Sequence, residues 1–272
     1  MAPSPTLPLK GRELVLHNSL DIDYWILDIF LDSMIPQRIK SSPETIRNNF
    51  DLQVERFSNI ETGQSTAIDS PLCMELVARS AALLNPNAAR VMDLGCGGGN
   101  YAVKVTSFLP DVDCTLIDLS ANMLAKAEER VRENITGTVT TIQGDYRDIP
   151  LEENAYDVIT AGTTLHHLRE VQEWELVFTK IYKALKHGGT FWISDIVIGE
   201  TDEINQMMLD GWLSMLRKQI SEEEIEMYLE RYETEDTPRT LSYQLELLKQ
   251  VGFSETIVLH KHFNFATFGA RK

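Results

Sequence analysis

The stretch from Arg90 to Asn100 constrains the fold of this chain more than any other. A short apolar run, residues 90–94, is typical of a buried strand. It continues into a glycine-rich turn, residues 95–99 (GCGGG), and then into a helical pattern. Glycines permit tight backbone geometry and close approach of a ligand, and the start of a helix offers free N–H groups. Strand, glycine turn and helix together predict a nucleotide-binding turn in an open α/β sheet.

The spacing of the glycines distinguishes between nucleotides. The dinucleotide fingerprint G-x-G-x-x-G fails, because its last position, counted from Gly95, is Asn100. The pattern that fits is Asp93-x-Gly95-x-Gly97-x-Gly99, an acid at the strand end followed by alternating glycines. This pattern resembles motif I of the class I S-adenosylmethionine (SAM) methyltransferases. The alternative is a glycine turn that binds no ligand.

Three later segments follow in the order that this resemblance implies. Asp118 ends a predicted strand, residues 113–118, and a carboxylate there can accept two hydrogen bonds from a ribose diol. Gly144-Asp145-Tyr146 follows the predicted strand 138–143, where the family places an acid near the adenine amino group and the next residue beside the ring. Residues 156–168 (YDVITAGTTLHHL) look like the FDxVxxxxxLHHL motif of many class I enzymes.

The resemblance therefore implies a SAM site in which Asp93 lies near the methionine amino end through water. Gly97 and Gly99 would let the backbone approach the cofactor, as would the backbone of Ala161 and Gly162. The full set of cofactor residues that we expect is Asp93, Gly95, Cys96, Gly97, Gly99, Asp118, Leu119, Met123, Gly144, Asp145, Tyr146, Ala161 and Gly162.

The order of elements predicts an α/β fold with a Rossmann-like, seven-stranded methyltransferase sheet. Strands alternate with helices up to a fifth strand at 190–197, and the helix before it is expected to end at the glycines of residues 187–189. Segments 255–260 and 263–270 predict an antiparallel C-terminal hairpin. We expect a helical extension or lid over residues 1–69, a SAM-binding domain over 70–272, and a helical insertion at about 201–236, after the fifth strand.

The predicted N-terminal helices are an amphipathic one at 21–35, a second opened by Ser42-Pro43 that carries Phe50, Val54 and Phe57, and a third at 70–84. In the family, this region usually covers the SAM pocket. A homodimer through these helices is a further expectation.

Composition limits the partners. The net charge of −16 argues against extended contact with nucleic-acid phosphates. No stretch approaches the ~20 apolar residues of a membrane span, and residues 1–10 carry three prolines and no long apolar run, unlike a signal peptide. Cys73, Cys96 and Cys114 lack metal-like or disulfide-like spacing. We therefore expect a cytoplasmic protein that acts on a small molecule.

Methyl transfer needs alignment of the nucleophile, and a base only if that nucleophile starts protonated. His166 and His167 are the candidate bases, with Asp195 as an orienting group or base. The alternative is that the two histidines shape the loop and pack against the cofactor. His260 and His262 share one face of a predicted strand, but the sequence offers no carboxylate or cysteine beside them, so no metal site is expected.

The predicted acceptor pocket is lined by Tyr24 and Trp25, by residues 50–69 and by residues 207–232. These segments are aromatic and apolar with few cations, which favours a neutral or cationic acceptor. The expected reaction is transfer of the sulfonium methyl of SAM to a small molecule, with S-adenosylhomocysteine as the second product.

Two alternatives stay open. The chain has a looser similarity to the carboxy-SAM synthases that serve wobble-uridine modification in tRNA, carried by Phe50-Asp51, residues 221–225 and residues 263–265 (FNF). The proline-glycine-tyrosine segment of that group is absent, and its carboxylate-binding arginine aligns with Leu229, with Arg231 two places on. The second alternative is a SAM-binding partner protein without catalysis.

Overall fold

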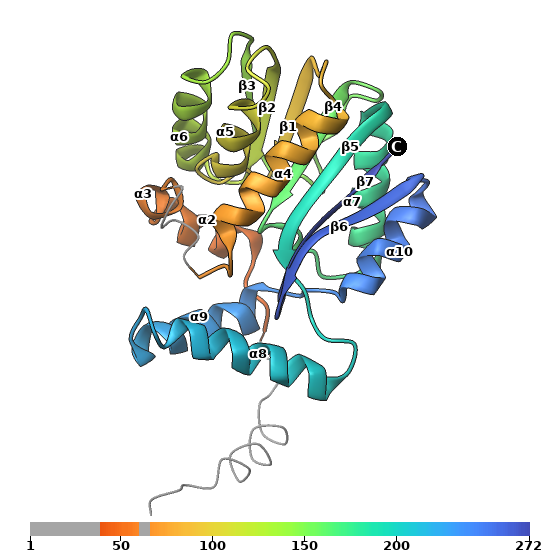
Figure 1. Cartoon of the computed structure of the whole chain (residues 1–272). Coiled ribbons are helices and arrows are strands. Elements are labelled where there is room, and N and C mark those ends of the chain that lie inside the picture. The colour runs from red at the N-terminus through yellow and green to blue at the C-terminus, as the bar shows by residue number, and fades with distance from the viewer. Residues whose placement is uncertain (1–38, 60–65) are drawn as a thin grey trace, which may run out of the picture. The chain divides into compact units, whose positions relative to one another are not determined.

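A seven-stranded sheet forms the centre of the fold, in the order β3-β2-β1-β4-β5-β7-β6 (Figure 1). The computed structural model describes residues 39–59 and 66–272, so the predicted helix at 21–35 lies outside the described residues. The strands are β1 (Arg90–Leu94), β2 (Asp113–Asp118), β3 (Val139–Gln143), β4 (Tyr156–Gly162), β5 (Leu185–Ile196), β6 (Glu255–His262) and β7 (Phe265–Arg271).

The pairing of these strands agrees with the predicted topology. Strands β1 to β5 pair in parallel, and β7 pairs antiparallel with both β5 and β6. The prediction of a Rossmann-like methyltransferase sheet with an antiparallel C-terminal hairpin is therefore confirmed. Parallel strands place their carboxyl ends at one edge, so the loops that follow β1, β2, β3 and β4 meet there.

Helices cover both faces of the sheet. Figure 1 shows α4 (Ser70–Leu84), α5 (Asn100–Thr106) and α6 (Ala121–Arg132) on one face, with α7 (Val171–Ala184) and α10 (Leu241–Val251) on the other. Each layer buries its own apolar cluster against the strands, the first around Met74 and Leu116 and the second around Trp174 and Phe191. Burial of such side chains stabilises a fold by ~1.5–3 kcal/mol each.

The remaining helices lie at the carboxyl edge of the sheet. They are α2 (Pro43–Asp51), α3 (Val54–Phe57), α8 (Asp202–Leu216) and α9 (Glu222–Glu235). Serine or threonine side chains cap α2, α8 and α9, through Ser42, Thr201 and Ser221. Helices α8 and α9 pack through a third apolar cluster that joins Trp212 and Ile225 to Phe265 of β7. This cluster holds the insertion formed by α8 and α9 against the carboxyl end of β5 and the start of β7.

Two predicted boundaries are wrong. Helix α7 ends at Ala184, and residues 185–189 already belong to β5. Here Gly188 donates to the carbonyl of Lys272 and Lys272 donates to that of Gly189, both at 2.9 Å. The partner strand comes from the far end of the chain, so the local glycine signal was misleading. The helix expected to carry both Phe50 and Val54 is also interrupted, since α2 ends at Asp51.

No helix in the described part of the chain combines the length and the apolar composition that crossing a membrane requires. The predicted boundary at residue 69, the homodimer and the cytoplasmic location stay predictions.

Candidate active site

The glycine turn after β1 has three left-handed positions, with φ of 59° at Gly95, 51° at Gly97 and 83° at Gly99. A Cβ at Gly95 would lie 2.1 Å from the hydroxyl oxygen of Thr164, and one at Gly99 would lie 2.9 Å from the Cβ of Ala127. A Cβ at Gly97 would meet nothing within 4 Å. Packing therefore requires Gly95 and Gly99, whereas Gly97 is the position open to a ligand.

A cavity opens beside Gly97 at the carboxyl edge of the sheet. Ten of the predicted cofactor residues line it, namely Asp93, Gly95, Cys96, Gly97, Asp118, Leu119, Met123, Asp145, Tyr146 and Gly162. Gly99, Gly144 and Ala161 do not line it. Gly99 packs on α6, Gly144 turns the chain at φ 154°, and Ala161 is buried within β4.

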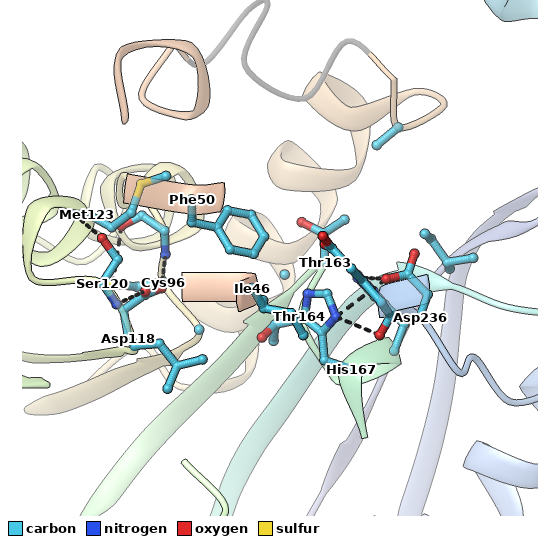
Figure 2. Close-up of a pocket in the computed structure, with 18 of the residues that line it drawn as sticks. Ile46, Phe50, Cys96, Asp118, Ser120, Met123, Thr163, Thr164, His167 and Asp236 are labelled. Atoms are coloured by element: carbon cyan, nitrogen blue, oxygen red, sulfur yellow. Dashed lines mark hydrogen bonds and ion pairs between the residues drawn. The ribbon is translucent and has the colours of Figure 1, made fainter. Parts of the chain in front are cut away.

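Asp118 closes one side of this cavity. Its carboxylate accepts hydrogen bonds from the backbone N–H groups of Gly97 at 2.8 Å and Ser120 at 2.9 Å. These bonds hold the carboxylate beside the open face of Gly97. Burial raises the pKa of Asp118 although both backbone bonds lower it. Figure 2 shows Asp118, Ser120 and Met123 together on this side.

Asp93 lies deeper, at the end of β1. It accepts hydrogen bonds from the hydroxyl of Thr160 at 2.6 Å and from the N–H of Ala102 at 3.1 Å. Burial raises the pKa of Asp93 to about 7, against the effect of those two bonds. A cationic amino group beside it would stabilise the ionised form.

The turn after β3 is organised by an ion pair that the sequence did not indicate. Asp145 accepts from the guanidinium of Arg147 at 2.6 Å, and Arg147 also reaches Glu173 at 2.9 Å. Tyr146 donates its hydroxyl hydrogen to the carbonyl of Thr164 at 2.9 Å. The pair fixes the turn that carries Asp145 and Tyr146 to the cavity wall.

The opposite side of the cavity carries a buried histidine–aspartate pair. His166 lies in the 3₁₀ turn η1 (Leu165–His167) and donates from Nδ1 to Asp195 of β5 at 2.5 Å. Asp195 also accepts from the N–H of Leu165 at 2.8 Å, and it does not itself line the cavity. Asp195 is therefore a positioning residue, and Nε2 of His166 is left to meet other groups.

Asp236 also lies on the histidine side of the cavity, and the sequence did not indicate it. Its carboxylate lies 3.4 Å from Nδ1 of His167 (Figure 2). The same carboxylate lies 3.6 Å from Nε2 of His166. The backbone holds it there, because the N–H of Thr237 donates to the carbonyl of His166 at 2.6 Å. No local pattern points to Asp236, since only the return of the chain from α9 brings it to η1.

The charged forms of His166, His167, Asp195 and Asp236 affect one another. Burial disfavours the charged form of His166, but the carboxylates of Asp195 and Asp236 outweigh it and raise its pKa to about 9. Burial raises the pKa of Asp236 to about 6 despite the nearby His166. Burial and the charge of His166 hold the pKa of His167 well below its usual value. Of the two predicted bases, His166 is the stronger.

The predicted scarcity of cations in the pocket is wrong. Four arginines besides the paired Arg147 line the cavity: Arg47, Arg56, Arg169 and Arg231. Three come from α2, α3 and α9, which are far apart in sequence, so only folding collects their charges. Ile46 and Phe50 of α2 lie between the Asp118 side and the His167 side (Figure 2). The predicted lining residues Tyr24 and Trp25 lie outside the described residues.

Comparison with known proteins agrees with this geometry. A family described as a methyltransferase domain matches residues 91–189. Carboxy-S-adenosyl-L-methionine synthase of Nautilia profundicola is 30% identical over 185 residues, which is 67% of this chain and 77% of that protein. Human N-acetylserotonin methyltransferase in complex with SAM has a TM-score of 0.59 at 18% identity, over 93% of this chain and 68% of that chain. The [4+2]-cyclase SpnF also has a TM-score of 0.59, at 15% identity, over 88% of this chain and 98% of that chain.

A glycine turn after β1, an acid at the end of β2 and an acid after β3, gathered around one cavity, define a class I SAM-binding site. The chain belongs to the class I SAM-dependent methyltransferase family, as its sequence predicts, and SAM is its cofactor. The two solved structures share its fold, and one of them bears the name of a cyclase. The reaction therefore has to be argued from the site.

Proposed function

We propose that this chain transfers the sulfonium methyl group of SAM to a hydroxyl of a small molecule that also carries an anionic group. The observation that carries the proposal is the buried hydrogen bond between His166, which lines the cavity opposite Asp118, and Asp195 behind it. A methyl group on a sulfonium sulfur is already activated. A positioned base is needed only when the nucleophile must lose a proton.

The proton balance fits this pair. A lone pair of the hydroxyl oxygen forms the new O–CH₃ bond while the C–S bond breaks, and sulfur keeps the bonding electrons as neutral S-adenosylhomocysteine. The hydroxyl proton passes to Nε2 of His166. Asp195 holds Nδ1–H, which fixes the tautomer and stabilises the imidazolium that forms. Asp236 lies 3.6 Å from Nε2, beyond hydrogen-bond distance, so Nε2 is left to accept the hydrogen bond of the acceptor hydroxyl.

The anionic group of the acceptor is proposed from the arginines. Arg231 lies with its guanidinium 5.6 Å from the ring centre of Phe50 and donates to Glu235 at 3.2 Å. Arg169 keeps its Nε–H buried without an acceptor among the described residues. Guanidinium groups bind carboxylates with two parallel hydrogen bonds. A hydroxy acid combines the nucleophile with such a carboxylate.

Formation of S-adenosylhomocysteine is the test. The protein is incubated with SAM and either a metabolite extract or a panel of hydroxy acids, matched with their methyl ethers and their methyl esters. We expect product with hydroxy acids only. Turnover of the methyl ethers, whose hydroxyl is blocked, would contradict the proposal.

Changing Asp236 to asparagine should move the pH profile. The base must be neutral, so kcat/KM of the natural protein rises about tenfold per pH unit and levels off near the His166 pKa of about 9. Asp236→Asn removes a carboxylate that raises this pKa, so the rising limb should shift to lower pH by about 1 unit or more. The rate at pH 7 should increase, which a pH series of initial rates measures.

The same series of initial rates against pH would also show whether Asp236, and not His166, is the base. If Asp236 itself takes the proton, the natural profile would rise near pH 6, where its pKa lies, and Asp236→Asn would be inactive at every pH. Asp210→Asn on the exposed side of α8 is the control, and its profile should match that of the natural protein.

Changing Arg231 to glutamine should raise KM for a hydroxy acid by about 10- to 100-fold, because one charge-assisted pair contributes ~1.5–3 kcal/mol. The affinity for SAM should stay within about threefold. Arg217→Gln, at the exposed end of α8, is the matched control. Equal KM values for Arg231→Gln and Arg217→Gln would show that Arg231 does not bind the acceptor.

A second candidate is an enzyme that forms a carboxylated SAM, the activity named for the Nautilia relative. Arg231 lines the cavity, whereas Leu229, which aligns with the carboxylate-binding arginine of that group, packs in the third apolar cluster. Mass spectrometry of the ligand retained by the purified protein separates the cases. Carboxylated SAM would support the second candidate, and SAM retained without any turnover would support a non-catalytic partner protein.

A further inference from the structure

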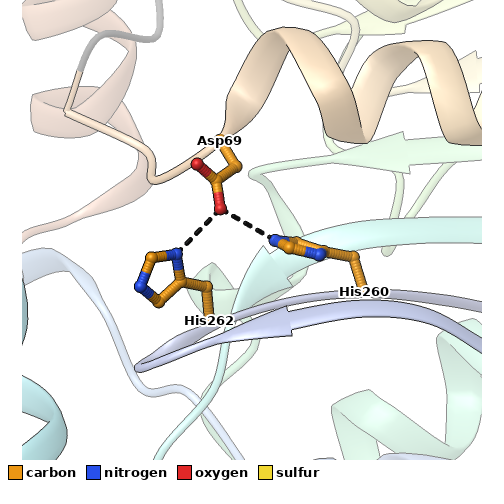
Figure 3. A group of neighbouring side chains, drawn as sticks. All are labelled: Asp69, His260 and His262. Carbon is orange, nitrogen blue, oxygen red and sulfur yellow. Dashed lines mark hydrogen bonds and ion pairs between the residues drawn. The ribbon is translucent and has the colours of Figure 1, made fainter.

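Asp69, His260 and His262 meet where the start of α4 faces β6 (Figure 3). Asp69 immediately precedes α4, and the two histidines lie near the end of β6. One oxygen of Asp69 lies 2.9 Å from Nε2 of His260 and 2.8 Å from Nδ1 of His262. The sequence showed the two histidines on one face of a strand, and folding supplies the carboxylate that was missing.

The distances suit a metal ion. A metal bonded to nitrogen and oxygen donors at about 2.0–2.2 Å separates neighbouring donors by about 2.8–3.6 Å, from octahedral to tetrahedral angles. Both oxygen–nitrogen separations lie in this interval, and the three donor atoms lie within 4.8 Å of one another. Two imidazoles and one carboxylate are ligands that late first-row metals prefer.

The surroundings also suit an ion that arrives from solvent. The exposed fractions of the side chains are 35% for Asp69, 23% for His260 and 40% for His262, so water can complete the coordination. Strand β6 is at the edge of the sheet and pairs only with β7 among the described strands. Asp69 has a φ of 55°, which is uncommon for a residue other than glycine.

We propose that Asp69, His260 and His262 bind a divalent transition-metal ion of the zinc class, at a site separate from the SAM cavity. Imidazole nitrogen is a poor ligand for magnesium or calcium, so the site should discriminate against both. The acidic chain, with a net charge of −16, also attracts cations over distance.

The ion would join two parts of the chain that are 191 and 193 residues apart. Two residues shortly before Asp69, Thr66 and Ala67, line the SAM cavity. The carbonyl of Thr66 accepts from the indole N–H of Trp212 at 2.8 Å. A bound metal would therefore hold this wall segment against β6, without taking part in proton transfer.

The test uses the full, untagged chain after removal of metal by chelation. Zinc binding is measured by calorimetry, and Co²⁺ serves as a spectroscopic probe, since its visible bands report nitrogen and oxygen ligands. We expect one Zn²⁺ per chain, no binding of Mg²⁺ at the same concentration, and a rise of Tm of about 5 °C at 100 times Kd. His260→Ala and His262→Ala should each weaken Zn²⁺ binding at least tenfold.

Two controls make the outcome decisive. His187→Ala removes an exposed histidine outside the site. His166→Gln changes the cavity, where His166, His167 and Asp236 also place donor atoms within 4.8 Å of one another. Both should leave zinc binding unchanged. Zinc affinity of the His260→Ala/His262→Ala double variant equal to that of the natural chain would overturn the proposal, as would loss of binding in His166→Gln alone.

Discussion

Changing Asp118 to alanine should weaken the binding of SAM by about 100-fold or more. The carboxylate is buried and is held beside Gly97 by two backbone N–H groups. It is therefore already oriented to accept hydrogen bonds from the two ribose hydroxyls. Charge-assisted hydrogen bonds contribute ~1.5–3 kcal/mol each, and two of them account for a change of this size. Isothermal titration with SAM measures it directly.

The control for this prediction is Asp210→Ala, which removes an exposed carboxylate from α8 and should leave the affinity unchanged. The loss of Asp118 also removes the acceptor for the N–H of Gly97, so the melting temperature of each variant has to be compared without ligand. A fully folded Asp118→Ala variant that binds SAM as tightly as the natural protein would show that the ribose assignment is wrong.

Changing His166 to glutamine should lower kcat by about 10²–10⁴-fold, the usual contribution of a positioned general base. The affinity for SAM should change little, because His166 lies on the cavity wall opposite Asp118. His167→Gln should reduce kcat by less than about tenfold, since the low pKa of His167 makes it a weak base. Single-turnover rates with a hydroxy acid measure the chemical step.

His187→Gln, an exposed histidine substitution, is the matched control and should be fully active. Asp195→Asn keeps the size of the positioning residue. It should reduce kcat and shift the rising limb of the pH profile to lower pH, because the carboxylate of Asp195 raises the pKa of His166. If His166→Gln retains the natural kcat and pH profile, the two histidines shape the loop, and the reaction does not use a base there.

The residues that gather around the glycine turn could be predicted because they lie in short contiguous motifs. Each motif follows a parallel strand, and the topology then gathers the strand ends at one edge. The reason that each glycine is required was not visible. Gly97 is open to the cavity, whereas Gly99 is required by close packing against Ala127. Gly144 and Ala161 were expected beside the cofactor on the basis of the resemblance, and neither lines the cavity.

The histidine side of the cavity and the cluster of Asp69, His260 and His262 could not be predicted, because their residues are distant in sequence. Asp236 reaches His166 only when the chain returns from α9, and Arg47 and Arg231 meet at the same cavity from opposite ends of the chain. Asp69 joins His260 in the same way. Electrostatic effects depend on distance and burial, and neither quantity follows from composition.

The sequence by itself determined the α/β sheet and the SAM family, and it indicated ten of the residues that line the cavity, since periodicity and local spacing encode strands, turns and their order. The tertiary structure decided which arginines line the cavity, the raised pKa of His166 and the carboxylate that joins the two histidines of β6. These properties arise from long-range contacts, in which burial strengthens the interaction between charges that the chain order keeps far apart.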